Sequence, residues 1–433
     1  MRLRINWFSP LRPANTAIAH YALQTVPALA RRADVVVWTQ RAYWPREMEQ
    51  YATVRRWDGE SWAALNAADA TLYHIGNDVR FHGWIWDVAS RHPGVMVLHD
   101  TRLHEFFAPK LLEGPEGESR YISTVRRVHG EAGVALAQRY LRGETTVEAL
   151  GEPLPLTAVA LERARGAIVH TGVAFEQAVA CGHCSVLQLD LPYTPGPPPP
   201  PRTWDGVLKM VVFGYLGLNR RIEAVLDGIA AFPDRDRLRL DIFGQHHAPA
   251  SLMRRIGELG LEEVVRLRGF VPEPDLDAAL DEAHLAINLR YPTMGEASAS
   301  QVRIWDRGLA SVVTRTGWYA ELPPDTVLFV DPENELADLH AHFRAALADP
   351  DRLAAMGRAG RGVLEESHDP AVYTGQLVAG VERMMFPPTS VATEAVAAIS
   401  RIADASGVNS AVRRSIARRA AGEVCRWLSP RPA

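Results

Sequence analysis

Residues 286–317 of this 433-residue chain read AINLRYPTMGEASASQVRIWDRGLASVVTRTG. An apolar strand, 286–289, leads into Arg290 and a turn with Pro292 and Gly295, and the small residues 297–300 follow where a helix is expected to begin. The first backbone N–H groups of a helix have no partner inside it, and the positive end of the helix dipole favours an anion. Small side chains would let a phosphate approach these groups. The segment therefore predicts an anion site at the head of a helix.

Glu296 stands directly before this predicted helix. A carboxylate beside a phosphate would only repel it, so we interpret Glu296 as an acceptor for hydroxyl groups such as those of a sugar. A phosphate and a sugar together indicate a nucleotide sugar. From this segment alone the alternative stays open, namely a strand, a turn and a well-capped helix that bind no ligand.

The composition and the lack of apolar segments indicate a cellular compartment more clearly than they indicate a function. A formal net charge of -4 and 47% hydrophobic residues give no reason to expect nucleic acid or an anionic membrane as a general partner. A chain of this length is expected to form two domains. The N-terminus MRLRINWFSPL has too short an apolar run for a signal peptide, and no segment approaches the roughly twenty apolar residues of a membrane span. We therefore expect a cytoplasmic protein.

Strand-like and amphipathic helical runs alternate along the chain, and a proline tract interrupts the alternation once. Such alternation is typical of parallel βαβ units, and the tract PGPPPPP is typical of a semi-rigid linker. We predict an N-terminal Rossmann-like domain (1–194), the linker (195–201), a C-terminal Rossmann-like domain (202–368), a further helix (369–386) and a basic tail (387–433).

The tail carries apolar residues at every fourth position across residues 408–428, with arginines on the other faces. This pattern predicts an amphipathic basic helix, which is compatible with peripheral contact with an anionic leaflet at the inner face of the membrane. The alternative is a helix that packs on its own domain. The oligomeric state is not indicated by the sequence.

Two doubly wound domains, a linker and a glutamate-bearing turn in the second domain together resemble the GT-B fold, specifically the retaining glycosyltransferases of family 4. The resemblance covers about residues 3–385 in element order, while its specific motifs lie in a few loops. It implies an α/β protein with two Rossmann-like domains facing a cleft and C-terminal helices that return to the first domain. By this resemblance residues 1–194 form the acceptor-binding domain, residues 202–368 form the nucleotide-sugar-binding domain, and the helix 369–386 crosses back to pack on the first domain. The resemblance also implies transfer of a sugar from a nucleotide-sugar donor to a hydroxyl of a glycan, polysaccharide or lipid-linked acceptor.

In that family two cations after the first strand of the second domain grip the donor pyrophosphate. Here the strand ends VVFGYLGLNRR, which places Gly214 and Tyr215 at the strand end and Arg220 where the family has a lysine. Tyr215 replaces the other cation. Arg290 follows a neighbouring strand and could take its place, since ligands of open α/β sheets bind at the carboxyl ends of strands.

Two further segments of the second domain match the family in part. Residues 267–272 (LRGFVP) resemble the segment whose backbone contacts the nucleobase. Glu296 corresponds to the first of two glutamates, the one near the donor sugar. The second glutamate, which is the ribose ligand, is replaced by Ile304 or Arg303 depending on the alignment. Asp306 is close enough to substitute but lies on a different helical face.

The first domain has counterparts as well. The loop after its first strand, SPLRPANTA, lacks the family's glycines, but its small residues would still let the donor phosphate approach, and Thr16 could instead cap the next helix. His99 resembles the family's histidine near the bond that is made. The segments YHIGND and HDTRLH end two strands and are expected to line the acceptor site.

The candidate site residues fall into three sets. The catalytic candidates are His99, Glu296 and Arg220. The donor-binding candidates are Thr16, Gly214, Tyr215, Arg220, Gly269, Phe270, Val271, Arg290, Met294, Gly295, Glu296, Ala297, Ser298, Ala299 and Ser300. The acceptor-binding candidates are Asn15, Asn77, Asp78, Asp100 and His104.

We expect no metal and no cofactor. The Asp-x-Asp at 234–236 precedes a strand and so sits at the wrong end of the sheet, and the C-x-x-C at 181–184 has no second pair of zinc ligands. The resemblance implies a front-face displacement with retention. Two alternatives remain, a GT-B protein that binds a nucleotide sugar without turnover as a partner or scaffold, and a GT-B sugar-nucleotide epimerase.

Overall fold

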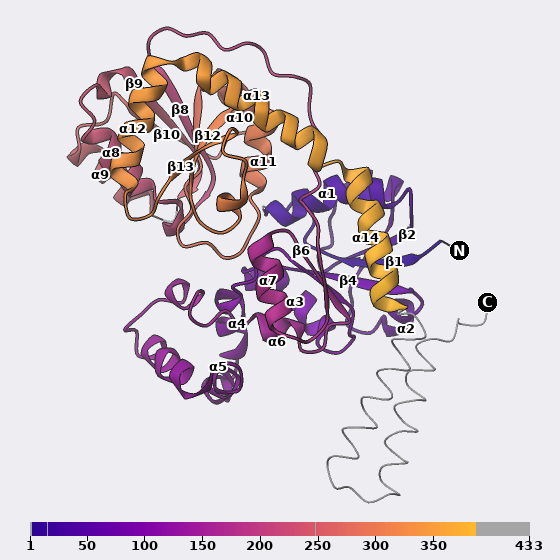
Figure 1. The fold of residues 1–433 in the computed structure, drawn as a ribbon. Helices are drawn as coiled ribbons and strands as arrows, with labels where there is room; N and C mark the ends of the chain where they lie inside the picture. The colour runs from indigo at the N-terminus through magenta and orange to yellow at the C-terminus, as the bar shows by residue number, and fades with distance from the viewer. Residues whose placement is uncertain (1, 15, 247, 387–433) are drawn as a thin grey trace, which may run out of the picture.

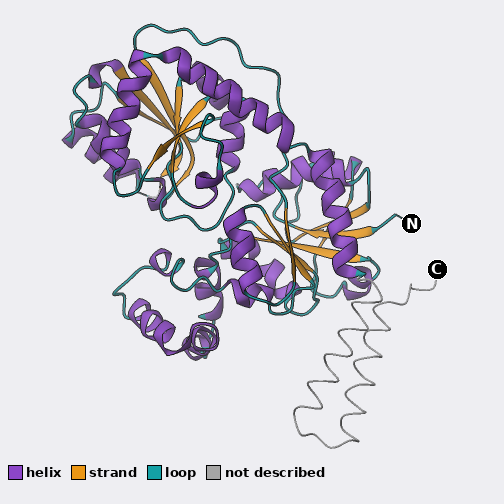
Figure 2. Cartoon of the chain, viewed as in Figure 1, coloured by secondary structure: helices purple, strands orange, loops and turns teal. Residues whose placement is uncertain are grey.

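The computed structural model describes residues 2–14, 16–246 and 248–386, and two α/β units are evident in it (Figures 1 and 2). Each unit is built on one sheet, and every strand pair in both sheets is parallel. The predicted pair of doubly wound sheets is therefore confirmed. Asn15 and the tail 387–433 lie outside the described residues, so the expectations for them stay predictions. Among the described helices, none is long and apolar enough to cross a membrane.

The first sheet has seven strands in the order β3-β2-β1-β4-β5-β6-β7. Its strands are β1 (Arg4–Phe8), β2 (Asp34–Thr39), β3 (Thr53–Arg56), β4 (Ala70–Ile75), β5 (Val95–Leu98), β6 (Gly166–Val169) and β7 (Ser185–Gln188). All six residues of β4 are buried, as expected for a central strand covered by helices on both faces. The edge strand β3 is mostly exposed, and its polar sequence TVRR gave no strand signal.

Helices of the first unit begin at side-chain caps. Thr16, Asp78 and Thr171 each accept a hydrogen bond from a backbone N–H in the first turn of α1 (Ala17–Leu29), α3 (Val79–Ala89) and α7 (Gly172–Ala180), respectively. Such caps satisfy N–H groups that have no partner inside the helix. The shorter helix α2 (Trp62–Asn66) leads into β4.

A helical excursion separates β5 from β6, and the sequence patterns above did not identify it. It contains α4 (His104–Leu111), α5 (Gly117–Leu141), the short turn η2 (Glu148–Leu150) and α6 (Thr157–Leu161). Figure 1 shows α5 standing away from both sheets. Gly130 has a positive φ of 67° inside α5, so this helix is two helices joined at a kink.

The second sheet has six strands in the order β10-β9-β8-β11-β12-β13. Its strands are β8 (Leu208–Leu216), β9 (Leu238–His246), β10 (Val265–Gly269), β11 (Leu285–Ile287), β12 (Ala310–Thr314) and β13 (Val327–Val330). The helices of this unit are α8 (Ile222–Ala230), α9 (Pro249–Glu258), α10 (Glu273–Glu282), α11 (Ala299–Asp306), α12 (Glu335–Ala348) and α13 (Pro350–Ser367).

The proline tract crosses between the sheets and is held against the second one. Asp306, at the end of α11, accepts a hydrogen bond from the Gly196 N–H at 2.8 Å and one from the Tyr193 hydroxyl at 3.2 Å. Arg361 of α13 donates to the Gly196 carbonyl at 2.6 Å. Asp306 thus anchors the linker, which removes it as a substitute ligand for ribose.

The last described helix, α14 (Pro370–Met385), returns to the first unit and lies beside α1 (Figure 1). Leu377 and Val381 are fully buried in the same core cluster as β1 and β2. The Tyr373 hydroxyl is hydrogen-bonded to the Tyr21 hydroxyl of α1. The prediction that C-terminal helices pack on the first domain is therefore confirmed.

Candidate functional site

The predicted anion site lies where the carboxyl end of β8 meets the head of α11. Gly214 has a φ of 110°, and a side chain built on it would approach the Ser300 hydroxyl at 3.6 Å. Ser298 caps α11 by accepting the Gln301 N–H at 3.1 Å, and the N–H groups of the first turn point out of the helix toward this space. The end of β8 and the head of α11 therefore lie next to each other.

Arg220 lies in the short turn η3 (Leu218–Arg220) and is only 3% exposed. It donates to the Asn288 side-chain oxygen at 2.7 Å and to the Phe213 carbonyl at 3.2 Å, while its Nε has no hydrogen-bond partner among the described residues. Burial and the nearby charge of Arg290 lower the pKa of Arg220 to about 10. It remains a cation at neutral pH, with one N–H without an acceptor.

A buried chain of amides behind Arg220 fixes its position, and no sequence signal pointed to it. Asn288 donates to the Gln301 side-chain oxygen at 2.9 Å, and Gln301 donates to the Ser311 hydroxyl at 2.8 Å. All of these groups are almost fully buried. Because each amide satisfies the next, the chain holds the Asn288 oxygen toward Arg220.

Arg290 and Glu296 form an ion pair, with Arg290 Nε 3.2 Å from Glu296 Oε1. The other carboxylate oxygen accepts from the Thr293 hydroxyl at 3.0 Å and the Met294 N–H at 2.6 Å. Burial disfavours the charged form of Arg290. The interactions with Glu296 and Tyr319 outweigh this effect, so the pKa of Arg290 is raised. The charge of Arg290 is therefore shared with Glu296, which leaves it a weaker phosphate ligand than the sequence indicated.

Met294 and Gly295 dock on the first domain. The Met294 carbonyl accepts the N–H groups of Thr101 and Arg102, both at 3.0 Å, and the Gly295 carbonyl accepts from the Thr171 hydroxyl at 3.2 Å. The N–H groups of Met294 and Gly295 are also hydrogen-bonded, within the turn. This use of their backbone groups argues against the direct donor contact predicted for both residues.

Gly295→Ala is expected to loosen this docking. Gly295 has a φ of 78°, and an added Cβ would lie 2.1 Å from the Thr101 hydroxyl oxygen. We expect a loss of more than ~1 kcal/mol in the free energy of unfolding, measured by urea denaturation, together with an increased radius of gyration in solution scattering. Gly114→Ala is the matched control, since Gly114 has a φ of 77° with nothing within 4 Å of its Cβ. Equal losses in the two variants would contradict the docking role.

Two groups of the first domain face this ion pair from the ends of β4 and β5. Asp100 accepts the Asn77 N–H at 2.9 Å. Burial and the negative charge of Glu296 raise the pKa of Asp100 to about 7. Both polar atoms of the Asn77 side chain are buried without a hydrogen-bond partner among the described residues. Asn77 and Asp100 are therefore brought together opposite Glu296, with hydrogen-bonding capacity left for a ligand.

His99 belongs to a cluster of buried imidazoles under α1 and α14. Its Nε2 is 3.1 Å from His74 Nδ1, where one nitrogen donates and the other accepts. The ring of His170 lies 5.1 Å from that of His99, and the ring of Tyr21 lies 4.8 Å away. Burial lowers the pKa of His99 well below its usual value, and the neighbouring histidines lower it further. Only Nδ1 of His99 remains to contact a ligand.

Two predicted acceptor residues have structural partners instead. His104 is fully buried, and its ring nitrogens pair with the Leu154 carbonyl at 2.7 Å and the Tyr121 hydroxyl at 2.8 Å. This arrangement argues against acceptor binding by His104. Asp78 caps α3 and forms an ion pair with Arg80 at 2.6 Å. Among the donor candidates, Thr16 likewise caps α1 through the Ile18 N–H at 3.2 Å.

The aromatic residues predicted for the donor site are strongly exposed. Tyr215 is 69% exposed at the carboxyl end of β8. Phe270 is 75% exposed on the loop that follows β10, after Gly269 with its φ of 67°. Val271 packs against a core cluster of the second unit. Exposed rings are available for stacking, whereas Val271 positions the loop.

The position of the family's second glutamate holds no carboxylate. Ile304 is buried in the core, and Arg303 forms ion pairs with Glu273 at 2.6 Å and Asp277 at 2.7 Å. Glu273 also lies 3.6 Å from Arg12 of the first domain. Glu273 thus links Arg303 to Arg12 across the domain boundary.

Two residues that no sequence pattern indicated lie in the short turn η5 (Gly317–Glu321). Tyr319 is fully buried beside Arg220 and Arg290, whose electrostatics it affects. Glu321 accepts the first two N–H groups of α7, those of Gly172 and Val173, both at 3.0 Å. A carboxylate of the second domain thus caps a helix of the first, a contact that no local pattern encodes.

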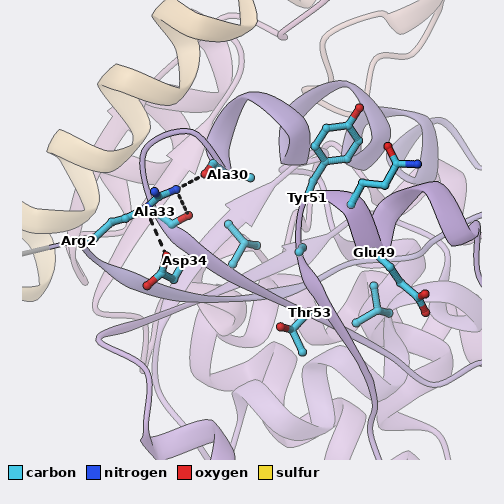
Figure 3. Close-up of a pocket in the computed structure, with 11 residues that line it drawn as sticks. Arg2, Ala30, Ala33, Asp34, Glu49, Tyr51 and Thr53 are labelled. Atoms are coloured by element: carbon cyan, nitrogen blue, oxygen red, sulfur yellow. Dashed lines mark hydrogen bonds and ion pairs between the residues drawn. The ribbon is translucent and has the colours of Figure 1, made fainter.

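A hollow of about 550 Å³ lies elsewhere on the first domain, at the starts of β2 and β3 (Figure 3). Arg2 crosses it to the Ala33 carbonyl at 3.2 Å and to Asp34 at 3.3 Å. None of the candidate site residues lines it. Across the described parts of the chain, no group of three or more His, Cys, Asp or Glu side chains is arranged to hold a metal ion.

Comparison with solved structures identifies the architecture. The chain is similar to HepE from Anabaena in complex with UDP-glucose (TM-score 0.60, 13% identity, 88% of this chain and 100% of that chain). It is also similar to sucrose-phosphate synthase from Thermosynechococcus elongatus (TM-score 0.61, 14% identity, 88% and 99%). A third similar structure is a glycosyltransferase from Rickettsia africae (TM-score 0.58, 9% identity, 89% and 100%). No protein-family model and no curated protein sequence matches the chain. At these identities the likeness is one of fold, and the chain has the two-domain GT-B fold.

Proposed function

We propose that this protein is a retaining glycosyltransferase that moves a sugar from a nucleotide-sugar donor to a hydroxyl acceptor. The observation that carries the proposal is the convergence of Arg220, with an N–H that lacks an acceptor, and the head of α11 on one side, and Asn77 and Asp100 on the other. Arg220 and the head of α11 offer positive charge and N–H donors for a diphosphate. Asn77 and Asp100 offer hydrogen-bonding groups for a hydroxyl. That HepE was solved with UDP-glucose supports a uridine nucleotide as the first donor to test.

The proposed chemistry is a metal-independent front-face displacement. The acceptor oxygen bonds to the anomeric carbon on the side from which the diphosphate leaves, and the acceptor proton passes to the departing phosphate oxygen. Negative charge grows on that phosphate as the bond breaks. Arg220 and the N–H groups at the head of α11 would stabilise it more in the transition state than in the ground state, which lowers the barrier.

Glu296 and Asp100 would hold hydroxyl groups in this scheme. The Glu296 oxygen that faces Arg290 would accept from the donor sugar, and His99 would contact it only through Nδ1. Asn77, whose side-chain amide lacks partners among the described residues, would orient the acceptor beside Asp100. The acceptor itself, whether glycan, polysaccharide or lipid-linked, belongs to the proposal only as a hydroxyl compound, and polysaccharide assembly in the cytoplasm is its suggested setting.

A panel of UDP-, GDP-, TDP- and ADP-sugars tests the function. We expect one of them to raise the melting temperature, because a ligand of the native state stabilises it, and to be consumed slowly with release of the nucleoside diphosphate, in EDTA as well as in magnesium. Glu296→Gln should lower this turnover about a hundredfold while its amide oxygen still accepts the Met294 N–H.

Other outcomes identify the rival functions. A changed nucleotide sugar without release of nucleoside diphosphate would indicate an epimerase. Binding without any turnover would indicate a scaffold, the alternative that the exposed Tyr215 and the Arg290–Glu296 ion pair favour. Turnover that stops in EDTA and returns with magnesium or manganese would contradict the metal-independent mechanism.

A further inference from the structure

Tyr319 is a buried phenol whose hydroxyl proton has no acceptor among the described residues. Buried tyrosine hydroxyls are nearly always hydrogen-bonded, because an unsatisfied polar group in the interior is costly. Tyr319 lies in η5 just after β12, at the carboxyl edge of the second sheet. An unsatisfied hydroxyl at that edge needs an explanation in terms of a ligand.

The surroundings of Tyr319 determine what the ligand must be. The side chains of Arg220 and Arg290 both lie close enough to the Tyr319 hydroxyl to donate toward its oxygen. A guanidinium group has N–H donors and no acceptor, so neither arginine can receive the phenolic proton. The Nε of Arg220 is a further buried donor without a partner. Donors that converge without acceptors call for an anion with several oxygens.

The head of α11 is the third group that surrounds the proposed anion site. Ser298, Asn288 and Arg220 are linked through the Asn288 side chain, which donates to Gln301 of α11 and accepts from Arg220. Gly214 leaves room beside Ser300, at 3.6 Å from a built Cβ. The space is thus bounded by a helix N-terminus, a buried cation and a buried hydroxyl, and these sources of attraction for an anion are independent of one another.

We propose that the Tyr319 hydroxyl donates a hydrogen bond to a diphosphate held between Arg220 and the head of α11. That this diphosphate belongs to a nucleotide sugar rests on the function proposed above. Tyr319 then supplies a neutral donor at a site where Tyr215 takes the place of a cation and Arg290 shares its charge with Glu296. The anion would then be held by the Nε–H of Arg220, the N–H groups at the head of α11 and the Tyr319 hydroxyl.

Tyr319→Phe removes the hydroxyl and little else, and inorganic pyrophosphate is the probe. We expect the dissociation constant for pyrophosphate, measured by calorimetry at constant ionic strength, to rise about tenfold, since a hydrogen bond to a charged group is lost. The melting temperature of the ligand-free variant should change little, because the deleted hydroxyl proton has no acceptor in the protein.

Tyr121→Phe is the matched control. Tyr121 is also fully buried, but its hydroxyl is hydrogen-bonded to His104 at 2.8 Å in the first domain. This variant should lose melting temperature and keep its affinity for pyrophosphate. The two tyrosines are therefore expected to respond differently in both measurements.

The outcomes separate this assignment from the proposed function. Unchanged pyrophosphate affinity in Tyr319→Phe overturns the assignment, as does a fall in its melting temperature as large as that of Tyr121→Phe, which would show a structural hydroxyl. No pyrophosphate binding by the unmodified protein also overturns it. Weakened pyrophosphate binding in a protein that neither binds nor turns over any nucleotide sugar would support the anion site and reject the glycosyltransferase.

Discussion

Arg220→Met is expected to reduce turnover of the nucleotide sugar by about a hundred- to a thousandfold, the cost of removing one pre-positioned group that stabilises developing charge. Arg220 is a buried cation whose Nε lacks an acceptor, and among the described residues it forms no ion pair with a carboxylate, whereas Arg290 is paired with Glu296. The loss should fall mainly on kcat, because charge on the leaving phosphate grows as the bond breaks. Single-turnover rates with the donor consumed by the unmodified protein give the measurement.

Stability should hardly change in this variant. Burial and Arg290 lower the pKa of Arg220 from 12.5 to about 10, so the buried charge costs roughly 3 kcal/mol of folding free energy. Methionine removes that cost but leaves the Asn288 oxygen without its donor, a penalty of about 1–3 kcal/mol. The two effects nearly cancel. A protein that has lost its activity by unfolding would show a lowered urea midpoint and would not support the catalytic interpretation.

Arg221→Met is the control for this experiment. Arg221 follows Arg220 in the sequence, but its guanidinium group is bound by Glu335 of α12 at 2.7 Å. We expect its turnover to stay within about threefold of the unmodified protein, because Glu335 already neutralises this guanidinium group and leaves no free charge for a ligand. Equal losses in the Arg220 and Arg221 variants would mean that net charge, rather than the buried position, governs the rate.

Acid is expected to destabilise the protein through its buried histidines. Burial lowers the pKa of His82 and of His170 to about 4, and it lowers the pKa values of His74 and His99 well below the usual value. An unfolded histidine titrates near 6.5. Between these values the unfolded state binds a proton that the folded state does not bind. Stability is therefore full above about pH 6.5 and is lost toward pH 4, at ~1.4 kcal/mol per pH unit for each histidine.

Two partly buried carboxyl groups have the opposite effect on stability when the pH falls. Burial and Glu296 raise the pKa of Asp100 to about 7, and burial and Glu148 raise that of Glu105 to about 7. The folded state holds these protons where the unfolded state releases them, so both groups add stability as the pH falls below about 7. The pH dependence of the free energy of unfolding is therefore the net effect of the histidines and the carboxyl groups. A variant that changes one histidine isolates its contribution.

His170→Asn supplies that comparison. Asparagine can still donate to the Leu189 carbonyl, which His170 Nδ1 contacts at 2.9 Å. Because pH 5 lies about 1.5 units below the pKa of an unfolded histidine, loss of the His170 imidazole should make the stability difference between pH 7.5 and pH 5 smaller by ~2 kcal/mol. Urea unfolding at both pH values measures this difference. His183→Asn, at an exposed position, should leave it unchanged, and an identical response of the two variants would contradict the prediction.

The sequence by itself determined the architecture and one half of the site. Buried runs such as β4 and caps such as Thr16 and Ser298 are local signals, because strand burial and helix capping depend on neighbours only a few positions away. The carboxyl ends of parallel strands share an edge, so the order of strands and helices is enough to place Arg220 beside the head of α11. The sequence patterns did not identify β3, which is mostly exposed, or the helical segment that contains α5. Neither shows the pattern of apolar residues that is typical of the core strands and helices.

Only the tertiary structure decided which polar groups are hydrogen-bonded within the protein and which remain available for a ligand. Arg102 binds the Thr293 carbonyl across 191 positions of the chain, and Glu321 caps α7 across 149. These contacts commit Met294 and Gly295 to the domain boundary and leave Tyr319 without an acceptor. A local pattern reports the chemical type of a side chain, but whether its hydrogen bonds are satisfied depends on partners that folding brings from distant positions. The candidate ligands are the groups that folding leaves unsatisfied, and for that reason the sequence could not separate Arg220 from Arg290 or reveal Tyr319.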